Sequence, residues 1–204
     1  SLHDAAKEIR LLFENLPLLQ IPRKPRAILV GDFYAKYNNI LNNNITEEIL
    51  SLGAEVIIPS YTETVNHFLH EDVIDDRKNT KFHKGFVLCE KRFELVFRGL
   101  LEEEIFEPPM EECTRLVDHY SFDRSLAGET AISLGRVLYM LEKRQVEAIV
   151  HINPVFCCPG VVSSSIFQRI KEEYKVPVID LFYDGNNKPN DLLKPQLYYL
   201  CKNN

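Results

Sequence analysis

The chain has 204 residues, of which 45% are hydrophobic and 26% are charged, and its formal net charge at pH 7 is −6. This length and composition are typical of a globular protein with one sizeable core. The acidic balance argues against a nucleic-acid partner. No apolar run approaches the roughly 20 residues that a membrane span requires, so no membrane partner is expected either.

The first region along the chain, residues 1–25, is expected to be an amphipathic lead helix over residues 2–19 followed by a linker. This helix starts abruptly, which suggests that the chain is a fragment of a longer protein. No signal-peptide pattern opens the chain, and a cytoplasmic location is therefore expected. Residues 26–204 are interpreted as a single α/β domain.

Four apolar runs in this domain are predicted to be strands of a parallel sheet, because strands buried on both faces are continuously apolar. They cover residues 26–32, 54–59, 146–152 and 176–182. Helices are predicted over residues 45–52, 128–141 and 191–201, and after the serines at 163–165. This alternation predicts an α/β fold, a flavodoxin-like or Rossmann-like three-layer sandwich with a four-stranded parallel sheet.

The long segment from about residue 62 to residue 113 departs from this alternation. It is helical in character, and Pro108-Pro109 interrupts it. We expect a helical excursion here, either a flap over the sheet or an oligomer contact. If the excursion is an oligomer contact, a homodimer is possible.

Five cysteines occur, at positions 89, 113, 157, 158 and 201. An odd number of cysteines without a secretion signal argues against a disulfide framework, so reduced thiols are expected. Cys89 and Cys113 are interpreted as ordinary buried or half-buried thiols. Cys201 has no companion ligand in the sequence.

The most informative segment covers residues 151–160, with the sequence HINPVFCCPG. It is predicted to be the end of a buried strand, a tight loop with Cys157 and Cys158, and the approach to a helix. Ligands of open α/β sheets bind at the carboxyl ends of strands, and a helix N-terminus favours a thiolate. Two interpretations stay open: iron–sulfur ligation, with Pro159 and Gly160 bringing backbone N–H groups near a sulfide, or thiols that pack beneath the loop.

Other catalytic patterns are absent from the sequence. It contains no dinucleotide fingerprint, P-loop, nucleophile elbow or H-E-x-x-H motif, and no Cys or His pairs at zinc spacing. A nucleophilic Cys157 would need a histidine partner from among His67, His70, His83 and His151. Each of these is interpreted as a surface histidine or as one with satisfied hydrogen bonds.

Four segments together carry a resemblance to a known family. They cover residues 27–32 with the following asparagine-rich loop, residues 53–60, residues 125–129 with the sequence SLAGE, and residues 153–160 leading to residues 176–185. In this order they resemble the 2-hydroxyacyl-CoA dehydratase and benzoyl-CoA reductase subunit superfamily. The similarity is closest to the C-terminal region of long activase-related chains, and it covers residues 26–200.

This resemblance implies a flavodoxin-like lobe that contributes a thiolate to a 4Fe-4S or related cluster. In the C-x-P-G loop of the family the ligand matches Cys157, which makes it the metal-binding candidate here. Cys158 and Gly160 are the other candidates for cofactor binding. Glu129 matches a Gly-Glu pair near the family's active site and is the catalytic candidate, although an acidic residue in a first helical turn is favourable for dipole reasons alone.

The function implied is that of a C-terminal lobe in an iron–sulfur protein, for low-potential electron transfer or dehydration of an acyl-CoA. The parent would be a dehydratase-like lyase or an ATP-dependent activase or reductase. Its partners would be the other lobe of the parent chain, an ATPase or activase module and an acyl-CoA substrate. The cysteines of that other lobe are missing here, so we expect the isolated chain to lack the cluster and to be inactive.

Two alternatives stay open beside this interpretation. The first is a non-catalytic interaction domain without a cluster. The second is an α/β domain that binds a small molecule, with the asparagines at positions 38, 39 and 42–44 as a hydrogen-bonding wall.

Overall fold

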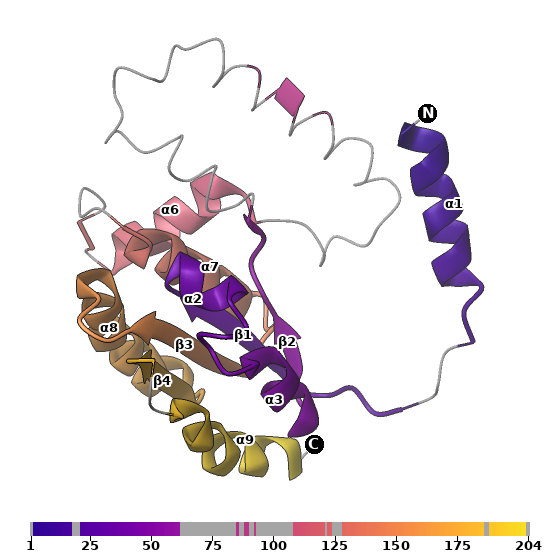
Figure 1. Ribbon diagram of the computed structural model, residues 1–204. Helices are drawn as coiled ribbons and strands as arrows, with labels where there is room; N and C mark the ends of the chain where they lie inside the picture. The colour runs from indigo at the N-terminus through magenta and orange to yellow at the C-terminus, as the bar shows by residue number, and fades with distance from the viewer. Residues whose placement is uncertain are drawn as a thin grey trace. The chain divides into compact units, whose positions relative to one another are not determined.

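A computed structural model describes residues 2–17, 21–61, 85, 88–89, 92, 108–120, 122–123, 128–185 and 188–202. The chain divides into two compact units. The first consists of Ser1–Ile21 with Val65–Glu107, and the second of Pro22–Thr64 with Pro108–Asn204. The second unit contains the sheet (Figure 1). The division of the sequence into residues 1–25 and 26–204 stays a prediction.

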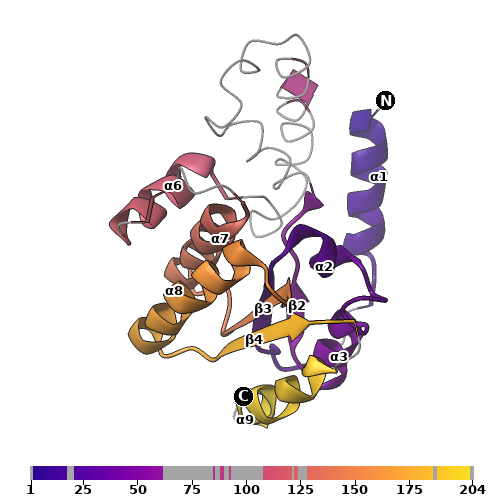
Figure 2. The ribbon, with the colours of Figure 1, turned by 60° about the vertical axis from the view of Figure 1, so that its left-hand side comes forward.

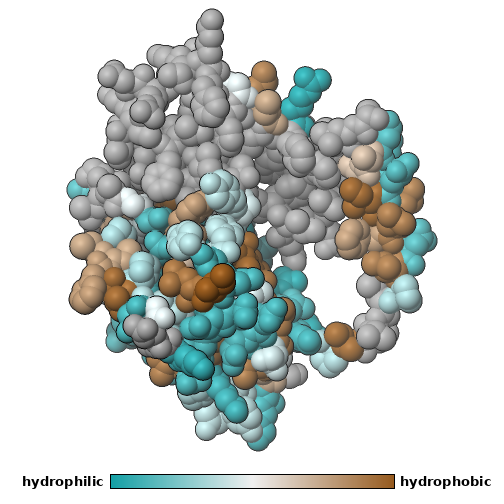
Figure 3. All heavy atoms as spheres, in the orientation of Figure 1, coloured by the Kyte–Doolittle hydropathy of each residue, from teal (hydrophilic) through white to brown (hydrophobic). Residues whose placement is uncertain are grey.

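The lead helix, α1, covers Leu2–Glu14 and is shorter than expected. The side-chain amide of Asn15 donates to the carbonyl of Leu11 at 2.6 Å, and Pro17 disfavours a helical conformation for the residue before it. Apolar side chains gather on this helix, and Leu12 and Phe13 are 69% and 65% exposed (Figure 3).

The sheet has four strands, namely β1 (Arg26–Gly31), β2 (Glu55–Ile57), β3 (Ala148–Pro154) and β4 (Val178–Tyr183). Their order is β2-β1-β3-β4, and every pairing is parallel. The two central strands, β1 and β3, are buried along almost their whole length, which explains their continuous apolar sequences. The predicted α/β fold with a four-stranded parallel sheet is therefore confirmed.

Helices cover both faces of the sheet and complete the three layers (Figures 1 and 2). The first layer contains α2 (Phe33–Tyr37), α3 (Ile45–Ser51) and α9 (Leu193–Lys202), the last preceded by a short 3-10 helix at Pro189–Leu192. The second layer contains α6 (Met110–His119), α7 (Thr130–Glu142) and α8 (Cys158–Tyr174).

The two faces of the sheet have separate apolar cores. On the first face, Leu29 and Val150 pack with residues of α2, α3 and α9. On the second face, Ile28 and Ile149 pack with residues of α6, α7 and α8, among them Phe167. Fully burying a side chain of this size contributes about 1.5–3 kcal/mol, so both layers stabilise the sheet that carries the site.

The expected helical excursion falls mostly outside the described residues. Its end lies in α6, which begins at Met110, directly after Pro108-Pro109, and continues to His119. Among the described helices, none is both long and apolar enough to cross a membrane.

Candidate functional site

The strand order creates a switch point between β1 and β3. From β1 the chain moves to β2 on one side, whereas β3 and β4 lie on the other side of β1. In doubly wound sheets of this kind, ligands bind in the crevice at the carboxyl ends of the two strands where the order reverses. Here β1 leads into Asp32, and β3 leads into Cys157. The topology therefore places the predicted cysteine segment at the expected binding position.

The cysteine turn, residues 154–160, connects β3 directly to α8. Phe156 has a left-handed backbone with φ of 65°, and the N–H of Cys157 donates to the carbonyl of Pro154 at 3.3 Å. Cys157 is the N-cap residue and Cys158 the first residue of α8. The helix was predicted to start near the serines, and this was wrong. It starts earlier, at Cys158, because Pro159 fits the first turn of a helix, where the N–H that proline lacks would have no partner within the helix.

The thiol of Cys157 is half-buried and lies in an acidic environment. Burial raises the pKa of this thiol most, the N–H of Gly160 lowers it, and nearby Asp32, Glu129 and Cys158 raise it further. The net effect is a raised pKa, so the free thiol is protonated at pH 7. The N–H of Gly160 in the first turn of α8 favours the thiolate, as expected of a helix N-terminus, but burial and the nearby carboxylates outweigh it.

The first turn of α7 is attached to the cysteine turn through Pro159. The hydroxyl groups of Thr130 and Ser163 both donate to the carbonyl of Pro159, at 2.9 and 2.8 Å. Gly128 has φ of +110°, and a Cβ there would lie 2.7 Å from Cγ of Pro159. The structure thus brings Glu129, the N-cap residue of α7, near Cys157, and the carboxylate makes no capping hydrogen bond.

Gly160 is buried in the first turn of α8 against the side chain of Asn153. A Cβ at Gly160 would lie 2.5 Å from Cγ of Asn153, so only glycine permits this approach. Oδ1 of Asn153 accepts the N–H of Asp32 at 3.2 Å, and Oδ1 of Asp32 caps α2 by accepting the N–H of Ala35 at 2.7 Å. Gly160 therefore serves the contact between α8 and the strand ends in this structure.

A buried polar cluster lies beneath α8, next to these residues. His151 on β3 is fully buried, and its Nδ1 lies 2.7 Å from Oδ1 of Asp180 on β4. Ser164 and Gln168 on α8 donate to the two oxygens of Asp180 at 3.0 and 3.1 Å. Nε2 of His151 lies 2.9 Å from Nδ2 of Asn153. The cluster joins the middle of the sheet to the cysteine turn.

The sequence did not predict this cluster as a unit. Of the two interpretations of His151, a surface position or satisfied hydrogen bonds, the structure agrees with the second, because the ring lies in the core with polar partners. A signal was present, since His151 and Asp180 are polar residues inside two apolar runs. The parallel register that places them side by side depends on the strand order.

The pH dependence of stability is expected to report on Asp180. Burial alone would raise its pKa, but hydrogen bonds from His151, Ser164 and Gln168 outweigh this effect, and the pKa is lowered. A lowered pKa stabilises the fold above the ordinary aspartate value of about 3.9, and this contribution is lost as the pH falls through the pKa of the folded state.

We therefore expect wild type to be more stable than Asp180→Asn at neutral pH, with the difference shrinking below about pH 4. Urea unfolding at several pH values measures this. A difference that stays constant down to the acid limit would show that the carboxylate is not held in its charged form by these bonds.

The asparagine-rich loop between α2 and α3 uses side chains on its own backbone. Oδ1 of Asn38 accepts the N–H groups of Ile40 and Leu41, at 3.1 and 2.9 Å. Asn42 is fully buried, and its Nδ2 donates to the carbonyl of Ala35 at 2.8 Å. These two asparagines of the loop stabilise its turn through hydrogen bonds to its own backbone.

Three aromatic rings lie after β1 and β2, at the same edge of the sheet as the cysteine turn. The ring centroids of Phe33 and Tyr61 are 4.7 Å apart, and those of Phe33 and Tyr37 are 5.6 Å apart. The hydroxyl of Tyr37 donates to the carbonyl of Pro59, which holds its ring in place. Tyr61 is 60% exposed, so this aromatic cluster offers a surface on which a planar group could stack.

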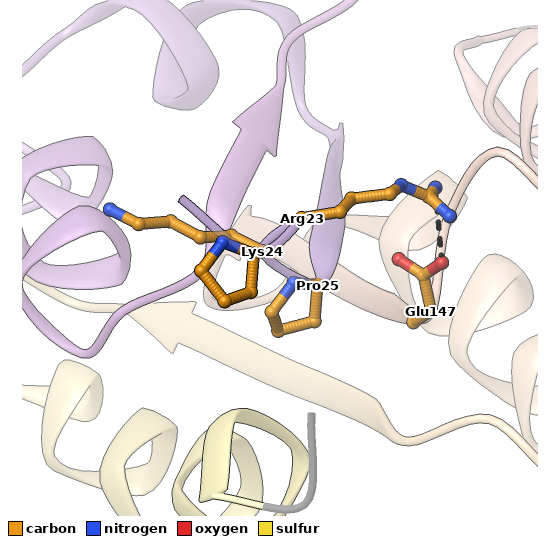
Figure 4. Close-up of a pocket in the computed structure, with 5 residues that line it drawn as sticks. Arg23, Lys24, Pro25 and Glu147 are labelled. Atoms are coloured by element: carbon orange, nitrogen blue, oxygen red, sulfur yellow. Dashed lines mark ion pairs between the residues drawn. The ribbon is translucent and has the colours of Figure 1, made fainter. Parts of the chain in front are cut away.

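A shallow pocket of about 270 Å³ lies at the opposite edge, before β1 and β3 begin (Figure 4). It is lined by Pro22, Arg23, Lys24, Pro25 and Glu147. The guanidinium of Arg23 pairs with the carboxylate of Glu147 at 3.2 Å. The pocket is thus separate from the cysteine turn, and its arginine is engaged by a carboxylate of the same chain.

A metal site made by this chain alone is not found in the part that the structure describes, where no three His, Cys, Asp or Glu side chains group around a common point. Of the proposed histidine partners for Cys157, His67, His70 and His83 lie outside the described residues. Among the described residues, the charged or ionisable groups that act on Cys157 are Asp32, Glu129 and the exposed thiol of Cys158.

Comparison of the chain with protein-family models, with curated proteins and with solved structures gives no match.

Proposed function

We propose that the unit with the sheet is one lobe of a cytoplasmic iron–sulfur protein, in which Cys157 supplies a single cluster thiolate. One observation carries this proposal: a half-buried thiol lies at the start of α8 and at the β1–β3 switch point. This is where doubly wound sheets bind ligands, and thiolates are the ligands that iron–sulfur clusters prefer. The resemblance to 2-hydroxyacyl-CoA dehydratases and their activases points to the same cofactor.

The residues around Cys157 bear on the reduction potential of a bound cluster. Asp32 and Glu129 raise the pKa of the free thiol, and because a thiolate-ligated cluster is itself an anion, the same carboxylates would make its reduction harder and so lower its potential. Metal binding releases the thiol proton, so a raised pKa makes loading depend on pH but does not prevent it. The bound cluster would supply low-potential electron transfer.

The remaining ligands are proposed to come from the other lobe of the parent chain. A cluster held by one thiolate would be weak, and cysteines from separate lobes or chains can share one cluster. An ATP-driven activase module would then serve as electron source, and an acyl-CoA as substrate. Within this chain, Cys157 would ligate, Gly160 would donate its N–H to the Cys157 sulfur, and Cys158 would lie beside the ligand.

A second candidate function is an interaction domain without a cluster, and the exposure of apolar residues at the cysteine turn favours it. Phe156 is 94% exposed and Val161 is 57% exposed, on either side of the exposed Cys158. An apolar surface of this kind fits a protein partner. The third alternative, a small-molecule site, stays open, and the aromatic cluster of Phe33, Tyr37 and Tyr61 offers a further surface for it.

The proposal is tested by iron and acid-labile sulfide analysis of the full-length protein, purified without oxygen. Wild type is expected to contain both, Cys157→Ala to lose most of its iron, and Cys158→Ala to keep it. The Cys158 variant is the matched control because the two thiols are adjacent. Iron that survives both substitutions, or a wild type that stays free of iron after reconstitution, would favour the interaction domain.

A further inference from the structure

The side-chain amide of Asn153 has a defined orientation, because each end of it meets a different group. Its Oδ1 accepts the N–H of Asp32 at 3.2 Å, although this N–H also donates to the carbonyl of Ile152 at 2.8 Å. With the oxygen on that side, the amide nitrogen must face His151. Asn153 is 2% exposed, so water does not offer it an alternative set of partners.

This orientation determines where His151 carries its proton. Nδ2 of Asn153 can only donate, and it lies 2.9 Å from Nε2 of His151, so Nε2 must accept. The ring proton then lies on Nδ1, which donates to Oδ1 of Asp180 at 2.7 Å. Ser164, also on α8, donates to the same carboxylate at 3.0 Å. In this assignment Nδ2 of Asn153, Nδ1 of His151 and Oγ of Ser164 each donate to an acceptor.

The other side of Asn153 supports the cysteine turn. Gly160 lies so close that a Cβ would come within 2.7 Å of Oδ1 and 2.5 Å of Cγ of Asn153. The N–H of the same Gly160 is directed at the sulfur of Cys157. Movement or rotation of the Asn153 amide would therefore shift the first turn of α8 and, with it, the thiol.

We infer that Asn153 is the positioning residue of the cysteine turn, and that the His151–Asp180 pair fixes the orientation of its amide. This inference deepens the proposed function, since it concerns how the proposed ligand Cys157 is held. Its geometry is nevertheless present in the chain without iron. It can therefore fail or succeed independently of the cluster proposal.

The first test uses the wild-type chain and needs no substitution. Long-range proton–nitrogen NMR spectra of the labelled protein distinguish the two neutral forms of His151. We expect the proton on Nδ1 and a bare Nε2. A proton on Nε2 in the neutral ring would mean that Asn153 does not donate to it, and this result would overturn the inference.

The second test replaces the donor by an acceptor of the same shape. In Asn153→Asp, one oxygen can still accept the N–H of Asp32, but the other faces Nε2 of His151. We expect Nε2 of His151 to carry a proton in the same spectra, because a carboxylate oxygen can only accept a hydrogen bond. An unchanged His151 would contradict the assigned contact, and a purely structural role for Asn153 would not produce this shift.

The third test measures the thiol itself in a Cys158→Ser background, by timed alkylation and mass spectrometry. Asn153→Leu removes the amide, and we expect the alkylation rate of Cys157 relative to Cys113 to rise about fivefold, as for a local opening made easier by about 1 kcal/mol. Asn190→Leu is the matched control, since Asn190 is also buried but lies on the short 3-10 helix. An equal ratio in both variants would overturn the inference.

Discussion

Gly31→Ala is expected to lower the free energy of unfolding by about 4 kcal/mol, one of the largest effects available in this fold. Gly31 ends β1 with φ of +114°, a conformation that costs other residues about 1–3 kcal/mol. A Cβ there would also lie 2.1 Å from the carbonyl oxygen of Ile152 on β3. Relieving this overlap requires the central strands to separate, and overpacking of this kind typically costs about 1–3 kcal/mol.

Urea unfolding followed by circular dichroism measures this loss, and Gly185→Ala provides the matched control. Gly185 also has a positive φ, +88°, but among the described residues no atom comes within 4 Å of its added Cβ. Gly185→Ala is therefore expected to lose only the unfolding free energy that a positive φ costs an alanine. If Gly31→Ala were no more destabilising than Gly185→Ala, the close approach of β1 and β3 beside the site would be refuted.

Gly160→Ala is expected to destabilise the protein by about 2 kcal/mol, although the same change inside an ordinary helix stabilises by about 1 kcal/mol. The reversal of sign follows from the contact with Asn153, whose Cγ and Oδ1 would lie 2.5 and 2.7 Å from the new Cβ. Both partners are buried, so neither can move into solvent. The first turn of α8 must shift instead.

A double-mutant cycle with Asn153→Ala isolates this contact. The loss of unfolding free energy caused by Gly160→Ala should be smaller when the amide of Asn153 is absent. The effects of substitutions at two residues that contact each other do not simply add. Urea unfolding of the four proteins provides the comparison. An equal cost in both backgrounds, or a stabilising Gly160→Ala in wild type, would show that this contact does not limit the turn.

Much of the fold could be predicted because buried parallel strands are apolar along their whole length. The runs that contain β1 and β3 were found for this reason, and the helices between strands followed from their amphipathic patterns. The strand order could not be predicted in the same way. The alternation of strands and helices along the sequence does not determine on which side of β1 the later strands lie. The switch point is therefore known only from the structure.

The candidate site was predicted in part. The cysteine turn was placed correctly at the carboxyl end of a strand, because the apolar run directly before it marks that strand. The acidic environment of Cys157 was missed, since Asp32 and Glu129 come from distant parts of the chain and meet only in the folded state. The partnership of His151 with Asp180 was missed for the same reason.

The proposed role of Cys157 as a cluster ligand is tested most directly by its protection from alkylation in the full-length protein, purified without oxygen. Each cysteine is followed by mass spectrometry before and after iron is removed by a chelator. Cys157 is predicted to be unreactive at first and to become reactive with chelation, while the exposed Cys158 reacts in both states. A Cys157 that alkylates at the same rate before and after chelation would contradict its assignment as a ligand.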